Sequence, residues 1–309
     1  MNAPFPVDPF QTAIAIAYRN KKSIADMVLP RVPVGKQSFK YLKHDLAEGF
    51  TIPETKVGRK SAPTEASFSA TEQTESVVDF ALDDKIPQGD INDAPDNFDP
   101  QTHSTESLTN LITLDREVRV AGLVFDPTVY VAGQKKVLSG SSQWNDYAAS
   151  DPLTEIMNAL DVPIMRPNSM TIGRKAFTRL AMHPIIVKAV HGNSGDSGIA
   201  SRQQLADLLE LDEIHVGEGW VNTARKGQPA NLVRVWGNHV SLTYIDSAAR
   251  PESGATFGFT AEYGSRIAGA VPDGDVGMRG GIKNRVGESV KELITAPDLG
   301  YLLQNVVAV

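Results

Sequence analysis

The chain of 309 residues contains no cysteine. Disulfide scaffolds, thiol catalysis and metal sites held by cysteine are therefore excluded. The chain also lacks an uninterrupted apolar run of about 18 residues, the length that a transmembrane helix needs, so no membrane span is expected. Its first residues lack the basic region and apolar run of a secretory signal. Nor is there an excess of positive charge: the net charge is −7, whereas proteins that bind DNA by bulk electrostatics are usually basic.

What the chain does contain is an uneven distribution of charge. Residues 1–60 carry ten Lys or Arg and five Asp or Glu, a balance of +5. Residues 61–110 carry one Lys and eleven Asp or Glu, a balance of −10. Neighbouring segments of opposite sign predict either two surfaces that meet, within one chain or between copies, or a pair of solvated loops.

The first 86 residues show little material for a core. Residues 1–35 contain five prolines around the apolar stretch Thr12–Tyr18, which predicts an arm with a short helix or strand and little core of its own. Farther along, Thr64–Ser69 and Thr74–Leu82 are predicted strands, and Gly58–Pro63 a turn. A two-stranded ribbon cannot bury enough surface to be stable alone, so we expect it to lean on something else.

One long helix is strongly indicated. Asp99 and Pro100 supply an N-cap and a proline at the first helical position, and apolar residues follow on more than one line of the helix. This pattern predicts a helix over about residues 100–125, buried along much of its length. The pair Asp126-Pro127 is expected to end it.

The remainder predicts a region of mixed helices and strands. Helices are expected at 152–160, 174–190 and 202–210, a turn with a short strand within 166–173, and strands at 213–216 and 286–294. Residues 232–235 and 240–244 predict a hairpin around Gly237-Asn238. Residues 250–281 are rich in glycine and are expected to be irregular, and the apolar stretch 299–309 closes the chain.

Candidate chemistry is weak. Ser197 lies in a Gly-Asp-Ser-Gly stretch similar to the nucleophile loop of chymotrypsin-like proteases, but Ile199 replaces the next glycine and no histidine has a matching context. A flexible loop explains this stretch more simply.

A second candidate is an acidic cluster that offers oxygen ligands for a cation: Asp90, Asn92, Asp93, Asp96, Asn97 and Asp99. It lacks the EF-hand spacing, and a solvated acidic loop is the simpler interpretation. No phosphate loop, dinucleotide motif or pair of zinc-binding histidines is present. The sequence therefore predicts no enzyme, no cofactor and no metal.

Three stretches carry a resemblance to a known family: Arg166–Pro184, Gln204–Gly219 and Arg285–Leu303. Together with the order of arm, charged ribbon, long helix, mixed region and returning strand, they resemble the major capsid protein of tailed bacteriophages. The resemblance extends over residues 24–309. It implies the Hong Kong 97 type capsid fold, of the α+β class, and a shell protein of the virion that assembles in the host bacterial cytoplasm.

The resemblance also implies a domain plan. An N-terminal arm takes residues 1–35 and an extended loop that lies over a neighbouring subunit takes residues 36–86. A peripheral domain combines residues 87–150 and 266–309 around a spine helix at 100–125, and an axial domain takes residues 151–265. The implied partners are copies of the chain in pentamers and hexamers, scaffolding, portal and decoration proteins, and packaged double-stranded DNA in weak contact. Because the chain begins at the arm, without a long helical pre-segment, a separate scaffolding protein is expected.

Two sets of site residues follow. Lys56, Arg59 and Lys60 at the loop tip are expected to meet Asp90, Asp93, Asp96 or Asp99 of a neighbouring subunit. Arg19, Lys21 and Lys22 in the arm are the candidates for genome contact. Two alternatives stay open at this stage. One is an encapsulin-type nanocompartment shell with the same fold, and the other is a serine hydrolase around Ser197.

Overall fold

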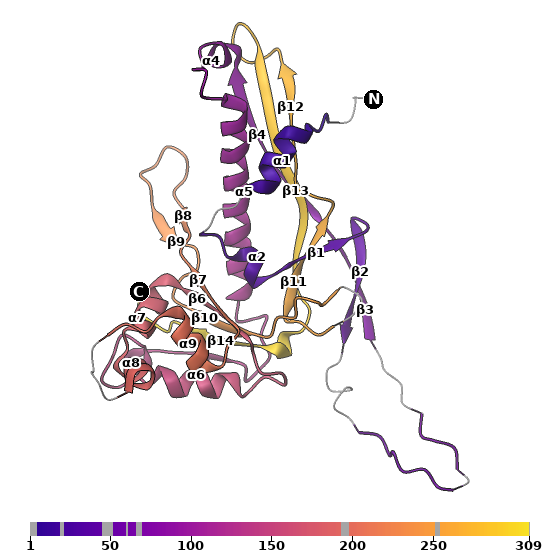
Figure 1. The fold of residues 1–309 in the computed structure, drawn as a ribbon, viewed down its shortest axis with the longest axis vertical. Coiled ribbons are helices and arrows are strands. Elements are labelled where there is room, and N and C mark those ends of the chain that lie inside the picture. The colour runs from indigo at the N-terminus through magenta and orange to yellow at the C-terminus, as the bar shows by residue number, and fades with distance from the viewer. Residues whose placement is uncertain are drawn as a thin grey trace.

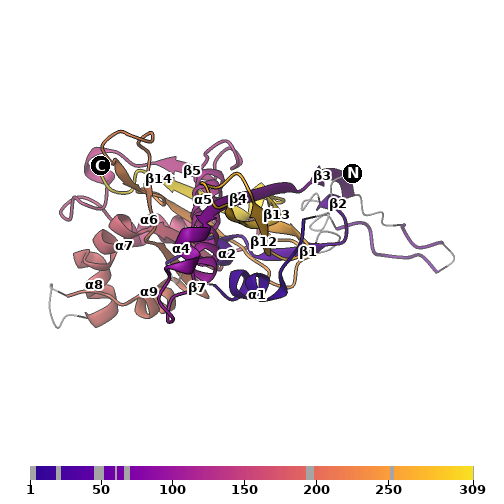
Figure 2. The same ribbon diagram turned by 90° about the horizontal axis from the view of Figure 1, so that it is seen from above.

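The computed structural model describes residues 5–18, 22–44, 52–59, 61–65, 70–192, 198–250 and 254–308. It has three parts, visible in Figure 1: an elongated body with a long helix beside long strands, a compact body at its foot, and a two-stranded ribbon that continues into a loop pointing away from both. Figure 2, viewed from above, shows the same loop extending on the side opposite the compact body. None of the described helices is long and apolar enough to span a membrane.

The elongated body is a five-stranded sheet with one long helix packed along it. Its strands are β1 (Arg31–Val34), β4 (Val78–Pro87), β11 (Gly258–Tyr263), β12 (Ile267–Asp273) and β13 (Gly281–Ile294). The long strand β13 pairs along one edge with β4 and along the other with β12 and then β11, all antiparallel, while β1 adds to β11 in parallel. Helix α5 (Pro100–Val124) lies along this sheet and contacts β13 and β4.

The predicted start of the long helix is confirmed. The Asp99 carboxylate accepts hydrogen bonds from the backbone N–H groups of Gln101 and Thr102, and Pro100 occupies the first turn. The predicted burial is only partly right. Leu111 and Val118 are 51% and 39% exposed, and the buried face instead includes charged side chains in the middle of the helix.

The N-terminal segment packs against the elongated body. Helix α1 (Pro9–Ala17) buries Ala15 against α5, β12 and β13. The Thr12 hydroxyl donates to the backbone carbonyl of Ala268 at 3.0 Å and accepts from the N–H of the same residue at 3.1 Å. Helix α2 (Ala25–Val28) joins a second cluster with the C-terminal half of α5. The short helix expected in this segment is therefore confirmed, and its buried residues pack on α5 and the sheet rather than in a core of the segment's own.

The ribbon exists, with strands displaced from their predicted positions. Strands β2 (Ser38–His44) and β3 (Ala70–Ser76) pair antiparallel. Their base is held because Phe39 packs on Phe259, Ala261 and Leu293 of the sheet. Residues 64 and 65 are not in a strand, and residues 66–69 lie outside the described part. The predicted strand Thr74–Leu82 is interrupted at Val77 between β3 and β4.

The compact body is a five-stranded sheet with helices packed on it. The strand order is β5 (Lys135–Val137), β14 (Gly300–Gln304), β10 (Val240–Thr243), β6 (Ser169–Gly173) and β7 (Glu213–Gly217). The helices are α6 (Pro152–Leu160), α7 (Arg174–Ala181), α8 (Pro184–His191) and α9 (Arg202–Leu209), and together with the sheet they bury the largest apolar cluster. The predicted domain boundaries divide the chain differently from the two sheets, since β5 and β14 lie in this body and β11 in the elongated one.

The single helix predicted at 174–190 is two helices. Pro184 starts α8, because a proline has no N–H to donate and disfavours the helical conformation in the residue before it. His183 serves as the N-cap: its Nδ1 accepts from the N–H of Ile185 at 3.3 Å, so the ring proton lies on Nε2, 3.1 Å from the Ser150 hydroxyl. Burial lowers the pKa of His183, which favours this neutral form.

The hairpin predicted around Gly237-Asn238 is also wrong. Strand β9 (Leu232–Arg234) pairs with β8 (Trp220–Asn222) in a separate ribbon, whereas β10 pairs with β6 and β14. The turn is real, with Gly237 at φ 47°, but it joins two different sheets. The segment 250–281, expected to be irregular, contains β11 and β12.

Candidate functional site: the charged junction and the assembly surfaces

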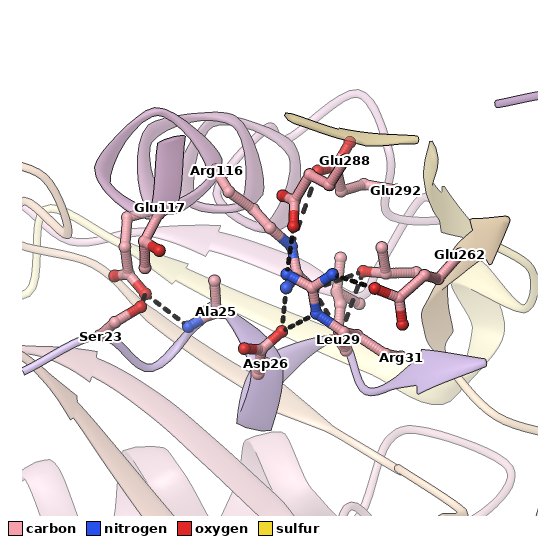
Figure 3. Close-up of polar contacts among 12 residues, drawn as sticks. Ser23, Ala25, Asp26, Leu29, Arg31, Arg116, Glu117, Glu262, Glu288 and Glu292 are labelled. Carbon is pink, nitrogen blue, oxygen red and sulfur yellow. Dashed lines mark hydrogen bonds and ion pairs between the residues drawn. The ribbon is translucent and has the colours of Figure 1, made fainter. Parts of the chain in front are cut away.

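Charged side chains gather where the N-terminal segment, α5 and the sheet of the elongated body meet (Figure 3). We call this set the charged junction, and it comprises Asp26, Arg31, Arg116, Arg119, Glu262, Arg266, Glu288 and Glu292. Four arginines face these four carboxylates, and Arg119 also pairs with Asp115 on the same helix. It joins segments that are far apart in the sequence.

Arg31, on β1, contacts three carboxylates from three elements. Its Nε lies 2.7 Å from Asp26, its Nη1 2.6 Å from Glu262 on β11, and its Nη2 3.0 Å from Glu288 on β13. A guanidinium presents its donors in a rigid plane and can serve several carboxylates at once, which a lysine cannot do in the same geometry. Arg31 therefore fixes how the N-terminal segment sits on the sheet.

Arg116 lies in the middle of α5 and is buried. It forms an ion pair with Asp26, and its Nη2 donates to the Thr260 hydroxyl at 2.9 Å and to the carbonyl of Leu29 at 3.3 Å. Its Nε faces Glu292 at 3.8 Å. Burial lowers the pKa of Arg116 because it disfavours the charged form, and the surrounding carboxylates oppose that shift.

Glu288, on β13, is the most buried carboxylate of the junction. Its Oε2 lies 3.0 Å from both Arg31 and Arg266. Burial alone would raise the pKa of Glu288, but three neighbouring guanidinium groups outweigh it, so the pKa lies below its ordinary value. Arg266 also donates to the carbonyl of Ala15 at 2.9 Å, which ties α1 into the same network.

Glu117, next to Arg116 on α5, connects the N-terminal segment to the compact body. Its Oε1 accepts from the backbone N–H groups of Ile24 and Ala25, each at 2.6 Å, and from the Ser23 hydroxyl at 2.5 Å. Its Oε2 accepts from the indole N–H of Trp236 at 2.5 Å. One buried carboxylate thus satisfies four donors and holds α2, α5 and the chain beside β10 together.

We expect Gly217→Ala to displace Trp236 and to lower the free energy of unfolding by about 1–3 kcal/mol, the usual cost of overpacking a core. A Cβ at this position would lie 2.0 Å from Cγ of the buried indole. Gly219→Ala is the matched control, because its Cβ would be 3.5 Å from the nearest atom of Val235, an ordinary contact. Urea denaturation of both variants measures the difference; equal stability would show that Trp236 does not need this glycine.

Sequence reasoning missed the junction, although the signals are present. The alternation predicted for β13 places Glu288 and Glu292 on the same face as Val286 and Val290, and an inward carboxylate demands a cation. In α5, Arg116 lies four residues after Ile112 and four before Val120, which puts it on a buried line. The sequence signal for the junction was therefore a charged residue at a position that the pattern places on an apolar, buried face.

The structure places the described loop-tip residues, Lys56 and Arg59, far from the predicted acidic residues of the same chain. Lys56 and Arg59 are exposed in the loop, and Lys60 lies outside the described residues. The acidic residues lie around α4 (Gln88–Asn92), at the far end of the elongated body (Figure 1). A contact between the two surfaces therefore requires a second copy of the chain.

The acidic loop lines a cavity of about 550 Å³ together with Phe98 and His103. Asp99 is used within the chain: its hydrogen bonds with Thr102 lower its pKa and cap α5. Asp90, Asp93 and Asp96 form no ion pair with any described residue. Across the described ranges, no group of three or more His, Asp and Glu could hold a metal ion.

The other predicted residues are placed only in part. Arg19, Lys21 and Ser197 lie outside the described residues, and Lys22 lines a groove beside α5. Part of the acidic surplus in residues 61–110 is paired within the chain, since Asp83 contacts Arg285 at 2.5 Å and Glu75 contacts Lys291 at 3.7 Å. Some carboxylates of the acidic segment 61–110 are therefore neutralised within the chain, while others form no ion pair with a described residue.

No known family profile matches the chain. It is 56% identical over 307 residues to the major capsid protein of Pseudomonas phage JBD67, and the alignment covers 99% of both chains. It is 28% identical over 246 residues to the major capsid protein of Burkholderia phage BcepMu, covering 77% of this chain and 76% of that one.

Solved structures share the fold. A phage-related protein from Bordetella bronchiseptica RB50 superposes with a TM-score of 0.77 at 26% identity, covering 98% of this chain and 99% of that one. The capsid of cyanophage P-SCSP1u gives a TM-score of 0.57 at 10% identity, covering 93% and 89%. A virus-like particle from Pyrococcus furiosus gives a TM-score of 0.55 at 15% sequence identity, covering 95% of this chain and 96% of that one.

Proposed function

Because the chain belongs to the major capsid proteins of tailed bacteriophages, we propose that its extended loop and acidic loop are the surfaces through which neighbouring subunits pair in the shell. The chain is a structural protein of the virion capsid, not an enzyme, and it self-assembles into the head shell. Its fold is of the Hong Kong 97 type. The observation that carries the function is 56% identity over essentially the whole chain.

The parts of the fold take roles in this proposal. The elongated body, around α5, is the peripheral domain, and the compact body, around β6 and β10, is the axial domain that gathers at five- and six-fold positions. The proposed arm is residues 1–35 and the proposed extended loop residues 36–86, and each also contributes a strand, β1 and β4, to the sheet of the elongated body. Support comes from the two separate sheets and from the loop that leaves both bodies.

The loop needs a surface that its own subunit does not offer. Residues 52–59 and 61–65 form no strand, and Ile52 and Val57 are exposed there. Lys56 and Arg59 are held by no ion pair with a described residue, which matches the unpaired Asp90, Asp93 and Asp96 at the other end of the molecule. Exposed pairs contribute about 0–1 kcal/mol each, so they would set register and partner rather than total affinity.

Charge reversal tests this pairing. Arg59→Glu with Lys60→Glu is expected to raise the protein concentration needed for assembly about tenfold at low salt, since two exposed pairs together contribute roughly 1–2 kcal/mol. Adding Asp90→Lys and Asp93→Lys is expected to restore assembly. Light scattering against protein concentration measures both variants. Unchanged assembly of the Arg59→Glu, Lys60→Glu variant would rule the pairing out.

Further partners belong to the same proposal. A scaffolding protein, a portal, decoration proteins and packaged double-stranded DNA are proposed as partners of the shell, and Arg19, Lys21 and Lys22 as contacts of the arm with the genome. The encapsulin-type alternative keeps the fold. The phage capsid relative, aligned over 99% of the chain, favours the head shell over a nanocompartment.

A further inference from the structure

A groove of about 490 Å³ opens between α5 and the β8–β9 ribbon. Asn110 and Leu114 of α5 form one wall, and Trp220 with Arg234 of the ribbon forms the other. Lys22 from the N-terminal segment and Arg174 at the start of α7 complete it. In Figure 1 the ribbon stands beside α5, away from the loop and from the acidic end of the molecule.

The groove is positively charged in an acidic chain. Lys22, Arg174 and Arg234 line it, against one acidic residue, Glu218, whose carboxylate lies 3.3 Å from Arg174. The positive charge extends beyond the groove along the segment that contains the ribbon. Residues 219–245 contain three arginines or lysines and no Asp or Glu, whereas the whole chain has a net charge of −7. Local charge of this kind attracts an anionic partner.

The ribbon also exposes an aromatic surface. Trp220 is 49% exposed, while Trp144 and Trp236 are fully buried. The Arg234 guanidinium lies 4.4 Å from the centre of the Trp220 ring. A stacked guanidinium and indole offer both a donor pair for a phosphate and a planar face for a base.

We propose that this groove binds the phosphodiester backbone of nucleic acid, with Arg174 and Arg234 on the phosphates and Trp220 against a base or sugar. The inference rests on the proposed function, since a head shell encloses a nucleic acid. It places the contact on Arg174 of α7 and on Trp220 and Arg234 of the ribbon, in addition to the arm residues. An acidic peptide would use the cations but not the aromatic face, so nucleic acid fits the groove better.

The test is the salt dependence of DNA binding by unassembled full-length protein. Each phosphate contact contributes about 0.9 to the slope of log affinity against log salt on duplex DNA. In the variant Arg174→Gln with Arg234→Gln, the magnitude of this negative slope should therefore decrease by about 1.8. Fluorescence anisotropy of a labelled 20-base-pair duplex measures it. The control Arg179→Gln with Lys188→Gln removes the same charge from exposed residues that do not line the groove, and should leave the slope unchanged. Equal slopes for the two variants would overturn the proposal.

Trp220 supplies an independent readout. Since the other two tryptophans are buried, quenching of intrinsic fluorescence on adding DNA should disappear in Trp220→Phe. Duplex and single-stranded oligonucleotides compared in this assay show which form fits the groove better. Poly-glutamate that quenches at the same concentration would overturn the choice of nucleic acid.

The two proposals fail differently. Wild-type protein that forms no shell under any condition contradicts the proposed function. Shells of normal form whose variants keep full DNA binding contradict only the groove.

Discussion

Replacing Glu117 by leucine is expected to lower the free energy of unfolding by about 3–5 kcal/mol, because each buried N–H left without an acceptor costs roughly 1–3 kcal/mol. Three such donors depend on this carboxylate: the backbone N–H groups of Ile24 and Ala25 and the indole of Trp236. A loss of this size removes much of the stability of an ordinary domain, so assembly should fail as well.

Glu106→Leu is the matched control, since Glu106 lies exposed on the same helix and forms no ion pair with a described residue. A surface change of that kind usually alters stability by no more than about 0.5 kcal/mol. Glu117→Gln should fall between the two, because its amide oxygen still accepts. Guanidinium denaturation followed by tryptophan fluorescence compares the three variants; equal midpoints for Glu117→Leu and Glu106→Leu would contradict the role assigned to Glu117.

Glu288→Gln is expected to cost about 3–5 kcal/mol, the effect of breaking a buried ion pair from one side. The variant leaves Arg31 and Arg266 without the carboxylate that lies 3.0 Å from each. Glu54→Gln, on the exposed loop, is a control for loss of one negative charge. A cost no larger than that of the control would show that the junction does not depend on Glu288.

The same variant should change the pH dependence of stability. The pKa of Glu288 is lower in the folded protein than in the unfolded chain. Its contribution is therefore complete above the unfolded pKa of about 4.3–4.5 and is lost as the pH falls through the folded value. Denaturation midpoints between pH 7 and pH 3 should fall less steeply in Glu288→Gln than in the wild type. Parallel curves would contradict this reading of the junction.

The sequence predicted best those elements whose signals are local. Asp99-Pro100 and Asp151-Pro152 each start a helix at the expected residue, because the carboxylate caps the backbone N–H groups and proline needs no donor there. The same signal at Asp8-Pro9 starts α1 and was not recognised. Strand partners were predicted poorly, since β9 and β10 adjoin in sequence yet pair in different sheets.

The site was less predictable than the fold. Glu292 on β13 lies 3.8 Å from Arg116 on α5, but 176 positions separate the two residues in the sequence and no local pattern encodes their approach. The ribbon was predicted from its β-forming residues, the extended loop from the family resemblance, and their pairing with the acidic residues from charge. Asp99 was predicted both as a helix cap and as an intersubunit contact, and the structure shows the cap; the pairing of Asp83 with Arg285 within the chain was not predicted.

Electron microscopy of the purified protein at high concentration tests the central claim most directly. A major capsid protein of this fold is predicted to form closed icosahedral particles, or sheets and tubes built from the same contacts. A monodisperse monomer under every condition, including low salt and high protein concentration, would contradict the claim.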